Sequence, residues 1–363
     1  MKARKIIAML LTTAMMLIFF SACGSSTPAQ TDTPAQTSST EAAAPADNTV
    51  YKLKINYNSP ELTPETCLET NFAQTIKAYL EEHAPGRFDV QIYPGAQLGT
   101  FSEALAGVSD GSIESALVNI STLINNDANL NVWQIPGSIK SIEECNMLLS
   151  DPAARETFSK VESDLGITVK TAFTAGARHF TNNVREIKVP SDMNGIVFRV
   201  MQSELYVKMV ESLGAIATPM SSSELYSALQ NGVVEGQENP TAFIISDLTY
   251  EVQNYMVTDG HVYSISPFVV NNKWYNSLPE DLQQVFDQAV EVATESAIAF
   301  VDKQEVEGLE WLRENGMTVY EPTEAELEEW HTAVYNGSYD YIVDLIGQQP
   351  VDDFMALINA VRG

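Results

Sequence analysis

Positive charge is scarce in this sequence: 20 lysines and arginines stand against 48 aspartates and glutamates, for a formal net charge of -28. Proteins that bind nucleic acid neutralise phosphates with clustered basic side chains. The folded part of the chain has no such cluster, so we expect no nucleic-acid partner. An anionic ligand would have to be attracted by a local positive pocket, because the surface as a whole repels it.

Cysteine and histidine are also rare, with three and four residues respectively. Beyond the N-terminal region only Cys67 and Cys145 remain, which is no disulfide framework, and we expect two buried thiols. The histidines show no metal-ligand spacing, and neither a G-x-G-x-x-G motif nor a phosphate loop is present. We therefore expect no metal and no cofactor.

One enzyme-like motif occurs, the run Gly107-Val108-Ser109-Asp110-Gly111, which matches the nucleophile elbow G-x-S-x-G. The elbow needs a strand before the serine and a helix after it. Here the pattern predicts a helix before Ser109 and a strand after it. We therefore predict no catalytic residue and no enzymatic activity.

The N-terminal region has the pattern of a targeting segment. Basic residues at 2–5 precede a mostly apolar run, Ile6 to Phe20, which is followed by Ser21-Ala22-Cys23-Gly24. This pattern predicts a lipoprotein signal peptide over residues 1–22, with Cys23 as the lipid anchor. Residues 23–49 are rich in Ser, Thr, Pro, Ala and Gln and predict a disordered tether. The folded part is then extracytoplasmic, lipid-anchored to the cell membrane on its periplasmic or outer face.

The remaining sequence alternates between strand and helix patterns. Apolar residues alternate over Lys52–Tyr57 and again from Phe88 to Ile92, and a helical period lies between them over Phe72–His83. This order predicts a βαβ unit with two parallel strands in one sheet. The same alternation continues downstream, and 363 residues exceed the usual size of one domain. The fold class is therefore α/β, in about two domains.

A helical pattern begins at Leu278-Pro279-Glu280 and runs to Asn315-Gly316. At ~1.5 Å per residue, such a helix would be roughly 50 Å long, which exceeds the width of one lobe. It should therefore cross both lobes. The alternative is two consecutive helices separated near Gly308.

Arg199 lies in an otherwise apolar strand pattern, Gly195 to Val200. An unpaired cation buried there would be strongly unfavourable, so Arg199 needs an anion. Its guanidinium fork matches a ligand carboxylate, and the alternative is a buried salt bridge with an Asp or Glu of the protein. Downstream, the strand at Val233 and Val234 should end in a polar loop, Glu235 to Pro240.

Three stretches together resemble one family: Gly176-Ala177-Arg178-His179-Phe180-Thr181-Asn182-Asn183, Gly195 to Val200, and the segment 213–251 with its Gly-Gln-Glu-Asn-Pro run. They are similar to the DctP-type solute-binding proteins of TRAP transporters, and Gly86 to Gly99 resembles the same family. The resemblance implies a two-lobed periplasmic-binding-protein-like fold with a long helix bridging both lobes. We expect the first lobe to comprise residues 50–175 and 265–304, and the second 176–264 and 305–363.

The resemblance also implies a ligand site. Arg199 stands at the position of the family's principal carboxylate ligand, Arg178 at that of a second, loop-borne cation, and Asn239 at that of an asparagine before proline. Polar side chains at predicted strand ends add Gln97, Asn119 and Gln237 as ligand-binding candidates, since ligands meet α/β sheets at such loops.

The function that follows is capture of an organic acid, either a C4-dicarboxylate or a sugar acid such as a uronate, by a protein expected to be a monomer. The implied partners are the small and large subunits of a TRAP membrane permease, which would receive the ligand. One alternative is a ligand-sensing module for a membrane receptor. Another is an extracytoplasmic hydrolase, for which Ser109 or a carboxylate pair would have to act.

Overall fold

The computed structural model describes residues 48–363. The predicted signal peptide (1–22), Cys23 and nearly all of the predicted tether (23–49) lie outside the described residues. No helix in the described residues is long and apolar enough to span a membrane.

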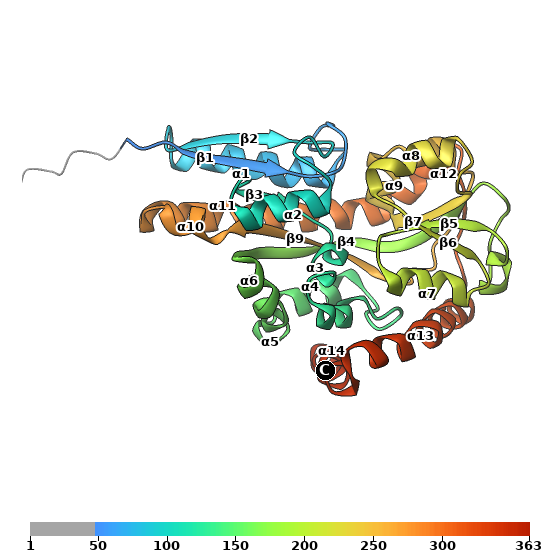
Figure 1. Cartoon of the computed structure of the whole chain (residues 1–363). Coiled ribbons are helices and arrows are strands. Elements are labelled where there is room, and N and C mark those ends of the chain that lie inside the picture. The colour runs from blue at the N-terminus through green and yellow to red at the C-terminus, as the bar shows by residue number, and fades with distance from the viewer. Residues whose placement is uncertain (1–47) are drawn as a thin grey trace, which may run out of the picture. The chain divides into compact units, whose positions relative to one another are not determined.

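The described strands form one mixed sheet in the order β2-β1-β3-β9-β4-β7-β5-β6, with β8 pairing with both β4 and β10 (Figure 1). The strands are β1 (Tyr51–Asn56), β2 (Phe88–Tyr93), β3 (Ser115–Leu117), β4 (Ile167–Asn182), β5 (Val197–Val200), β6 (Ile216–Pro219), β7 (Gly236–Pro240), β8 (Tyr255–Val257), β9 (Tyr263–Asn271) and β10 (Thr318–Tyr320).

The predicted βαβ unit is confirmed. β1 and β2 pair in parallel from Tyr51 opposite Phe88 to Asn56 opposite Tyr93, and α1 (Leu68–His83) connects them. Leu53 and Ile55 of β1 are fully buried. The alternation of apolar and polar residues therefore places one face of β1 in the core.

One long strand, β4, joins two parts of the sheet. Its residues up to Ala177 pair with β9, and Arg178 to Asn182 pair with β7. We call β1, β2, β3, β9 and β4 up to Ala177 the first half-sheet. The rest of β4 with β5, β6, β7, β8 and β10 is the second half-sheet.

The sequence prediction of two polar loops was wrong. Gly176 to Asn182 continues β4, and the run from Gly236 to Pro240, predicted to be a loop, is the buried strand β7. Polar side chains are tolerated in these central strands because they satisfy one another: Gln237 donates to Thr181, for example, at 2.8 Å.

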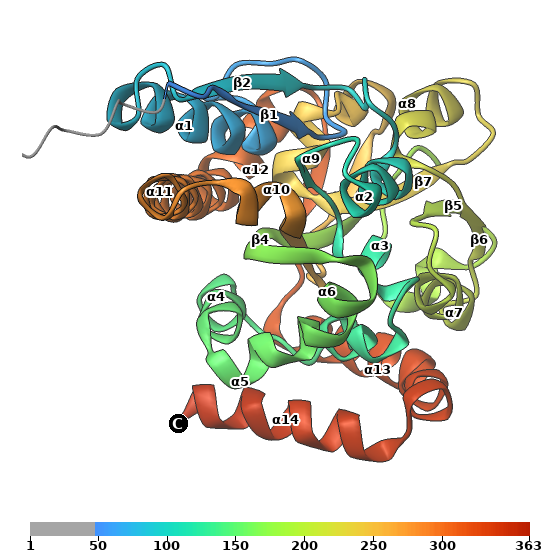
Figure 2. The same ribbon diagram turned by 60° about the vertical axis from the view of Figure 1, so that its left-hand side comes forward.

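Helices cover both faces of the sheet (Figure 2). They are α1, α2 (Phe101–Asp110), α3 (Ile120–Ile124), α4 (Ile142–Ser150), α5 (Pro152–Arg155), α6 (Ser159–Leu165), α7 (Glu204–Ser212), α8 (Ser222–Gln230), α9 (Thr241–Ser246), α10 (Asn272–Ser277), α11 (Glu280–Lys303), α12 (Leu309–Glu314), α13 (Glu324–Ile346) and α14 (Gln348–Arg362).

Each half-sheet has its own cores. On the first half-sheet, α1 and α11 pack Phe72 and Phe286 with Phe268, and the opposite core includes Trp133 and Phe354. On the second half-sheet, α7 and α13 enclose a separate core that contains Phe180, Phe198, Tyr206 and Trp330. Because Phe354 belongs to α14, the C-terminal helix packs on the core of the first half-sheet. The lobe boundaries given above stay a prediction.

The long helix predicted between Leu278 and Gly316 is present as one continuous helical run. It consists of α11, a π-helical turn over Gln304–Gly308, and α12. α11 packs against α1 and β4, the π-helical turn packs against α9, and α12 against β10. The run therefore bridges elements of both half-sheets. Gly308 does not break it; a Cβ there would meet Thr241 Cγ2 at 2.7 Å, so the glycine permits close packing on α9.

A glycine is required where β4 passes from one half-sheet to the other. Gly176 has a φ of 104°, and a Cβ at this position would collide with Glu305 Oε1 of the π-helical turn. We expect Gly176→Ala to lower the free energy of unfolding by about 1–3 kcal/mol, the usual cost of a strained backbone position. Urea unfolding would measure this loss.

Gly195→Ala is the matched control, because Gly195 also has a positive φ, 77°, but nothing lies within 4 Å of the added Cβ. Gly195→Ala should lower the free energy of unfolding by less than Gly176→Ala does. If both variants lost the same free energy of unfolding, the collision of the added Cβ with Glu305 would contribute nothing to the destabilisation.

Candidate functional site

A cavity of about 300 Å³ lies between segments of the two half-sheets. Loops that follow β1, β2 and β3 line one part of it, and β5, α8, α9 and the end of β7 line the other. Hydrogen bonds already join the two parts: Asn58 Nδ2 donates to Ser222 Oγ at 3.1 Å, and Ser59 Oγ donates to Asp247 Oδ1 at 3.0 Å. The cavity is of a size that suits a small solute.

Arg199 lines this cavity and has no carboxylate partner among the described residues. Arg199 lies on β5 between Phe198 and Val200, which both point into the core. Because successive side chains of a strand point to opposite faces of the sheet, Arg199 points to the other face. The side chain is buried, and its Nε and Nη2 donate to the carbonyl oxygen of Met220 at 3.1 and 2.9 Å. Burial lowers the pKa of Arg199 to about 10, so the guanidinium remains charged at neutral pH.

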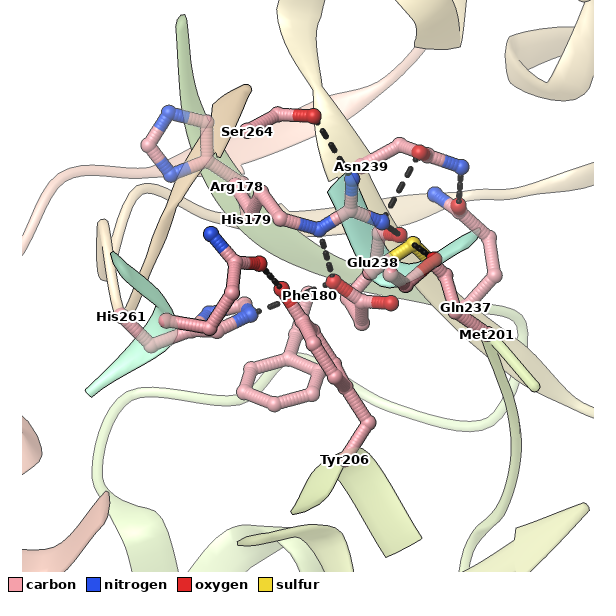
Figure 3. Close-up of polar contacts among 12 residues, drawn as sticks. Arg178, His179, Phe180, Met201, Tyr206, Gln237, Glu238, Asn239, His261 and Ser264 are labelled. Carbon is pink, nitrogen blue, oxygen red and sulfur yellow. Dashed lines mark hydrogen bonds and ion pairs between the residues drawn. The ribbon is translucent and has the colours of Figure 1, made fainter. Parts of the chain in front are cut away.

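Arg178, by contrast, is fully engaged within the protein (Figure 3). Its Nε forms an ion pair with Glu238 Oε2, and its Nη2 donates to the Glu238 carbonyl at 2.6 Å and to Asn239 Oδ1 at 2.9 Å. Nη1 donates to Ser264 Oγ at 3.3 Å. Arg178 is therefore a strand residue whose charge is compensated within the protein, and not the loop-borne cation that the family resemblance implied.

The ion pair continues into a buried chain of charges. His261 Nε2 lies 3.3 Å from Glu238 Oε2, and His261 Nδ1 lies 2.6 Å from Asp259 Oδ2. Burial disfavours the imidazolium, but the two carboxylates outweigh it and raise the pKa of His261 to about 9. Burial also opposes ionisation of Glu238, but Arg178 and His261 lower its pKa to about 2. Cations and anions thus alternate, and each charge has an opposite neighbour.

The stability of the protein should fall in mild alkali because of His261. A histidine whose folded-state pKa is raised stabilises the fold fully below its unfolded pKa of about 6.5, and the contribution is lost as pH rises through the folded value. We expect the free energy of unfolding to decrease between pH 7 and 9, by at most about 1.4 kcal/mol per pH unit. Urea unfolding at several pH values measures the slope.

His261→Gln provides the comparison for this slope, because other groups also titrate in alkali. The variant should be less stable than the wild type at pH 7, and the difference should narrow toward pH 9 and above. A difference that does not change with pH would contradict the assignment of a buried imidazolium.

The remaining predicted ligand residues divide into two groups. Asn239 and Asn119 are both buried and line the cavity, with Asn119 capping α3 and donating to Ser264 Oγ at 3.4 Å. Gln97 is exposed, and Gln237 is buried behind Asn239, whose Nδ2 donates to Gln237 Oε1 at 2.6 Å. Neither Gln97 nor Gln237 lines the cavity.

Two acidic lining residues, Glu69 and Asp247, were missed by sequence reasoning. Glu69 is on α1 and accepts a hydrogen bond from the Ser59 backbone N–H at 2.7 Å, and Asp247 ends α9. Burial and the charge of Asp247 raise the pKa of Glu69 to about 7, and burial raises that of Asp247 to about 6. No local motif marks them, because they are 178 positions apart in the sequence and are brought together only by folding, with Ser59 bonded to both.

The enzyme-like motif plays no part in this cavity. Ser109 lies within α2, and its Oγ donates to the carbonyl oxygen of Leu165 at 2.7 Å. Cys67 and Cys145 are both buried and unpaired, as predicted. No group of metal-ligating side chains occurs among residues 48–363.

Comparisons with known proteins identify relatives of this chain. The family model described as "Bacterial extracellular solute-binding protein, family 7" (DctP) matches residues 60–342. The chain is 26% identical over 282 residues to the C4-dicarboxylate-binding periplasmic protein DctP of Rhodobacter capsulatus, which covers 77% of this chain and 84% of that protein.

Solved structures of TRAP periplasmic solute-binding proteins have the same fold. One from Roseobacter denitrificans, with bound L-galactonate, is 26% identical, with a TM-score of 0.76 over 85% of this chain and 99% of that one. One from Haemophilus influenzae, with bound L-gulonate, is 25% identical, with a TM-score of 0.78 over 86% and 99%. These neighbours are substrate-binding proteins and not enzymes, and their two-lobed α/β fold is the one predicted. The chain belongs to the DctP family of bacterial extracellular solute-binding proteins.

Proposed function

We propose that this protein is the extracytoplasmic solute-binding subunit of a TRAP transporter, which captures an organic acid by its carboxylate and delivers it to the membrane permease. In this proposal Arg199 holds the carboxylate. Arg178, Asn239 and Asn119 provide the surrounding polar lining. The protein itself catalyses no reaction.

The observation that carries this proposal is the state of Arg199. It is 3% exposed, lines the cavity and has no ion-pair partner in the described part of the chain, whereas Arg178 is neutralised by Glu238. A buried cation without an anion is unfavourable, and an incoming carboxylate would supply one. With two of its nitrogens on the Met220 carbonyl, the guanidinium is also fixed in orientation before ligand binds.

The ligands of the relatives support the same chemical class. The relatives described above are a C4-dicarboxylate-binding protein and proteins with bound L-galactonate and L-gulonate. All of these ligands carry a carboxylate. For the present chain we propose only this shared property, a ligand that carries a carboxylate, and none of the individual ligands.

Thermal unfolding in the presence of a panel of acids tests the proposal. A ligand at 100 times its dissociation constant adds about 2.7 kcal/mol to the stability of a protein. We expect at least one small carboxylate to raise the melting temperature, and the uncharged alcohol of the same skeleton to leave it unchanged. Stabilisation by the alcohol alone would contradict the proposal.

A receptor-bound sensor would show the same ligand binding, so the membrane partner needs its own experiment. We expect uptake of the ligand into vesicles that contain the small and large permease subunits, and only when this protein is added. Lipid attachment at Cys23 also stays a prediction. Ligand binding without such uptake would favour the sensor.

A further inference from the structure

The charges around the cavity restrict which acid it can hold. Of the residues that line it, four carry a guanidinium or carboxyl group: Arg199, Arg178, Glu69 and Asp247. Glu238 already compensates Arg178. One cation is therefore left for a ligand anion, and two carboxyl groups share the same space.

The two carboxyl groups are held together by Ser59. Its backbone N–H donates to Glu69 Oε2 at 2.7 Å, and its hydroxyl donates to Asp247 Oδ1 at 3.0 Å. Two carboxyl groups held by one residue repel each other when both are ionised, and burial together with the negative charge of Asp247 raises the pKa of Glu69. A third anionic group placed beside them would add to this repulsion.

This part of the cavity also has a hydrogen-bond acceptor that lacks a donor. Asn58 lines the cavity and follows β1; its Oδ1 is buried and has no hydrogen-bond partner within the described residues, although its Nδ2 donates to Ser222. Carboxylate oxygens accept hydrogen bonds and cannot donate when ionised. Asn58 Oδ1 therefore needs a hydrogen-bond donor, and the remaining lone pairs of ionised Glu69 and Asp247 can accept further donors from the ligand.

We propose that the cavity selects a monocarboxylate whose other end bears hydrogen-bond donors, with its carboxylate on Arg199 and its donors at Asn58, Glu69 and Asp247. Dicarboxylates are disfavoured, because their second carboxylate has no free cation to meet and would lie near Glu69 and Asp247. This inference rests on the proposed function and names the ligand class within it. The donors can be hydroxyl groups, as in a polyhydroxy acid, or a terminal ammonium group, as in an ω-amino acid.

Isothermal titration calorimetry on the full chain at pH 8 tests the inference. The probes are D-galactonate, succinate, 4-aminobutanoate and the neutral polyol galactitol. We expect D-galactonate or 4-aminobutanoate to bind at least tenfold more tightly than succinate, and galactitol not to bind. The tighter of the two donor-bearing acids identifies the donor as hydroxyl or ammonium, because D-galactonate has only hydroxyl donors and 4-aminobutanoate only an ammonium group.

Asp247→Asn should reduce this preference at least tenfold, since it removes one of the two negative charges. Glu69→Gln is a second variant with the same expected direction, in case either one folds poorly, and the melting temperature reports folding. Asp340→Asn is the matched control, because Asp340 is exposed on α13 and does not line the cavity. The control should keep the full preference.

The possible failures are distinct. Succinate binding as tightly as the donor-bearing acids, with no change in the ratio on Asp247→Asn and Glu69→Gln, would overturn the inference and leave the proposed function standing. If no carboxylate bound at all, the proposed function would fail and the inference with it.

Discussion

Replacing Arg199 by alanine is expected to weaken carboxylate binding by about two to three orders of magnitude. Loss of one partner from a buried, hydrogen-bonded charge pair costs about 2–5 kcal/mol, and each 1.4 kcal/mol is about a factor of ten. The fold should tolerate the change, because among the described residues Arg199 donates hydrogen bonds only to the Met220 carbonyl. Calorimetry with the best acid from the panel measures the affinity.

Arg199→Lys tests whether carboxylate affinity depends on the positive charge of Arg199 or on the planar geometry of its guanidinium group. Lysine keeps the positive charge but lacks the planar fork, so it cannot bond to a carboxylate and to the Met220 carbonyl in the same geometry. We expect an affinity between those of the wild type and the alanine variant. Lys77→Ala, on the exposed side of α1, should change nothing. Undiminished affinity in a folded Arg199→Ala protein would exclude the carboxylate role.

Glu238→Gln is expected to lower the free energy of unfolding by about 3–5 kcal/mol, the usual cost of breaking a buried ion pair from one side. Glu238 is fully buried and neutralises Arg178 while accepting a hydrogen bond from protonated His261. Glutamine preserves the size of the side chain and removes its charge, so two cations remain close together without an anion between them. Chemical unfolding near neutral pH measures the loss.

The loss should be larger at pH 7 than at pH 9. In the variant, His261 keeps only Asp259 as an acidic neighbour, so the imidazolium is less favoured and its charge beside Arg178 is repulsive. Loss of that proton in alkali relieves the repulsion. Glu329→Gln, at an exposed position on α13, is the control and should leave stability unchanged. If Glu238→Gln lowered the free energy of unfolding no more than the control does, then Arg178 and His261 would not need the charge of Glu238 for their stability.

Local patterns were sufficient for the regular parts of the fold. The alternation over Lys52–Tyr57, the following helical period and the stripe that begins at Pro279 each reflect one buried face, which a single sequence displays directly. The buried cation Arg199 could likewise be predicted, because one charged residue among apolar neighbours is visible without knowledge of the fold.

The strand Gly236–Pro240 could not be predicted in the same way. Its Gln, Glu and Asn are typical of loops, and they are stable in a central strand only because Thr181, Arg178 and His261 provide partners from distant parts of the chain. The same is true of Glu69 and Asp247, which are brought together through Ser59. Such long-range polar pairs form only in the folded structure, and they leave no periodic pattern in the sequence.

The continuity of β4 determines which binding residues would move together if the two half-sheets separated. Arg178 is the first residue of β4 to pair with β7, and Arg199 and Asn239 lie on β5 and β7 of the same half-sheet. If the two half-sheets moved apart near Gly176, these three residues would move together on paired strands, whereas Glu69 and Asn58 would move with the first half-sheet. An acid would then bind first through its carboxylate at Arg199. Asn58 and Glu69 would select for hydrogen-bond donors on it only when the two half-sheets came together again.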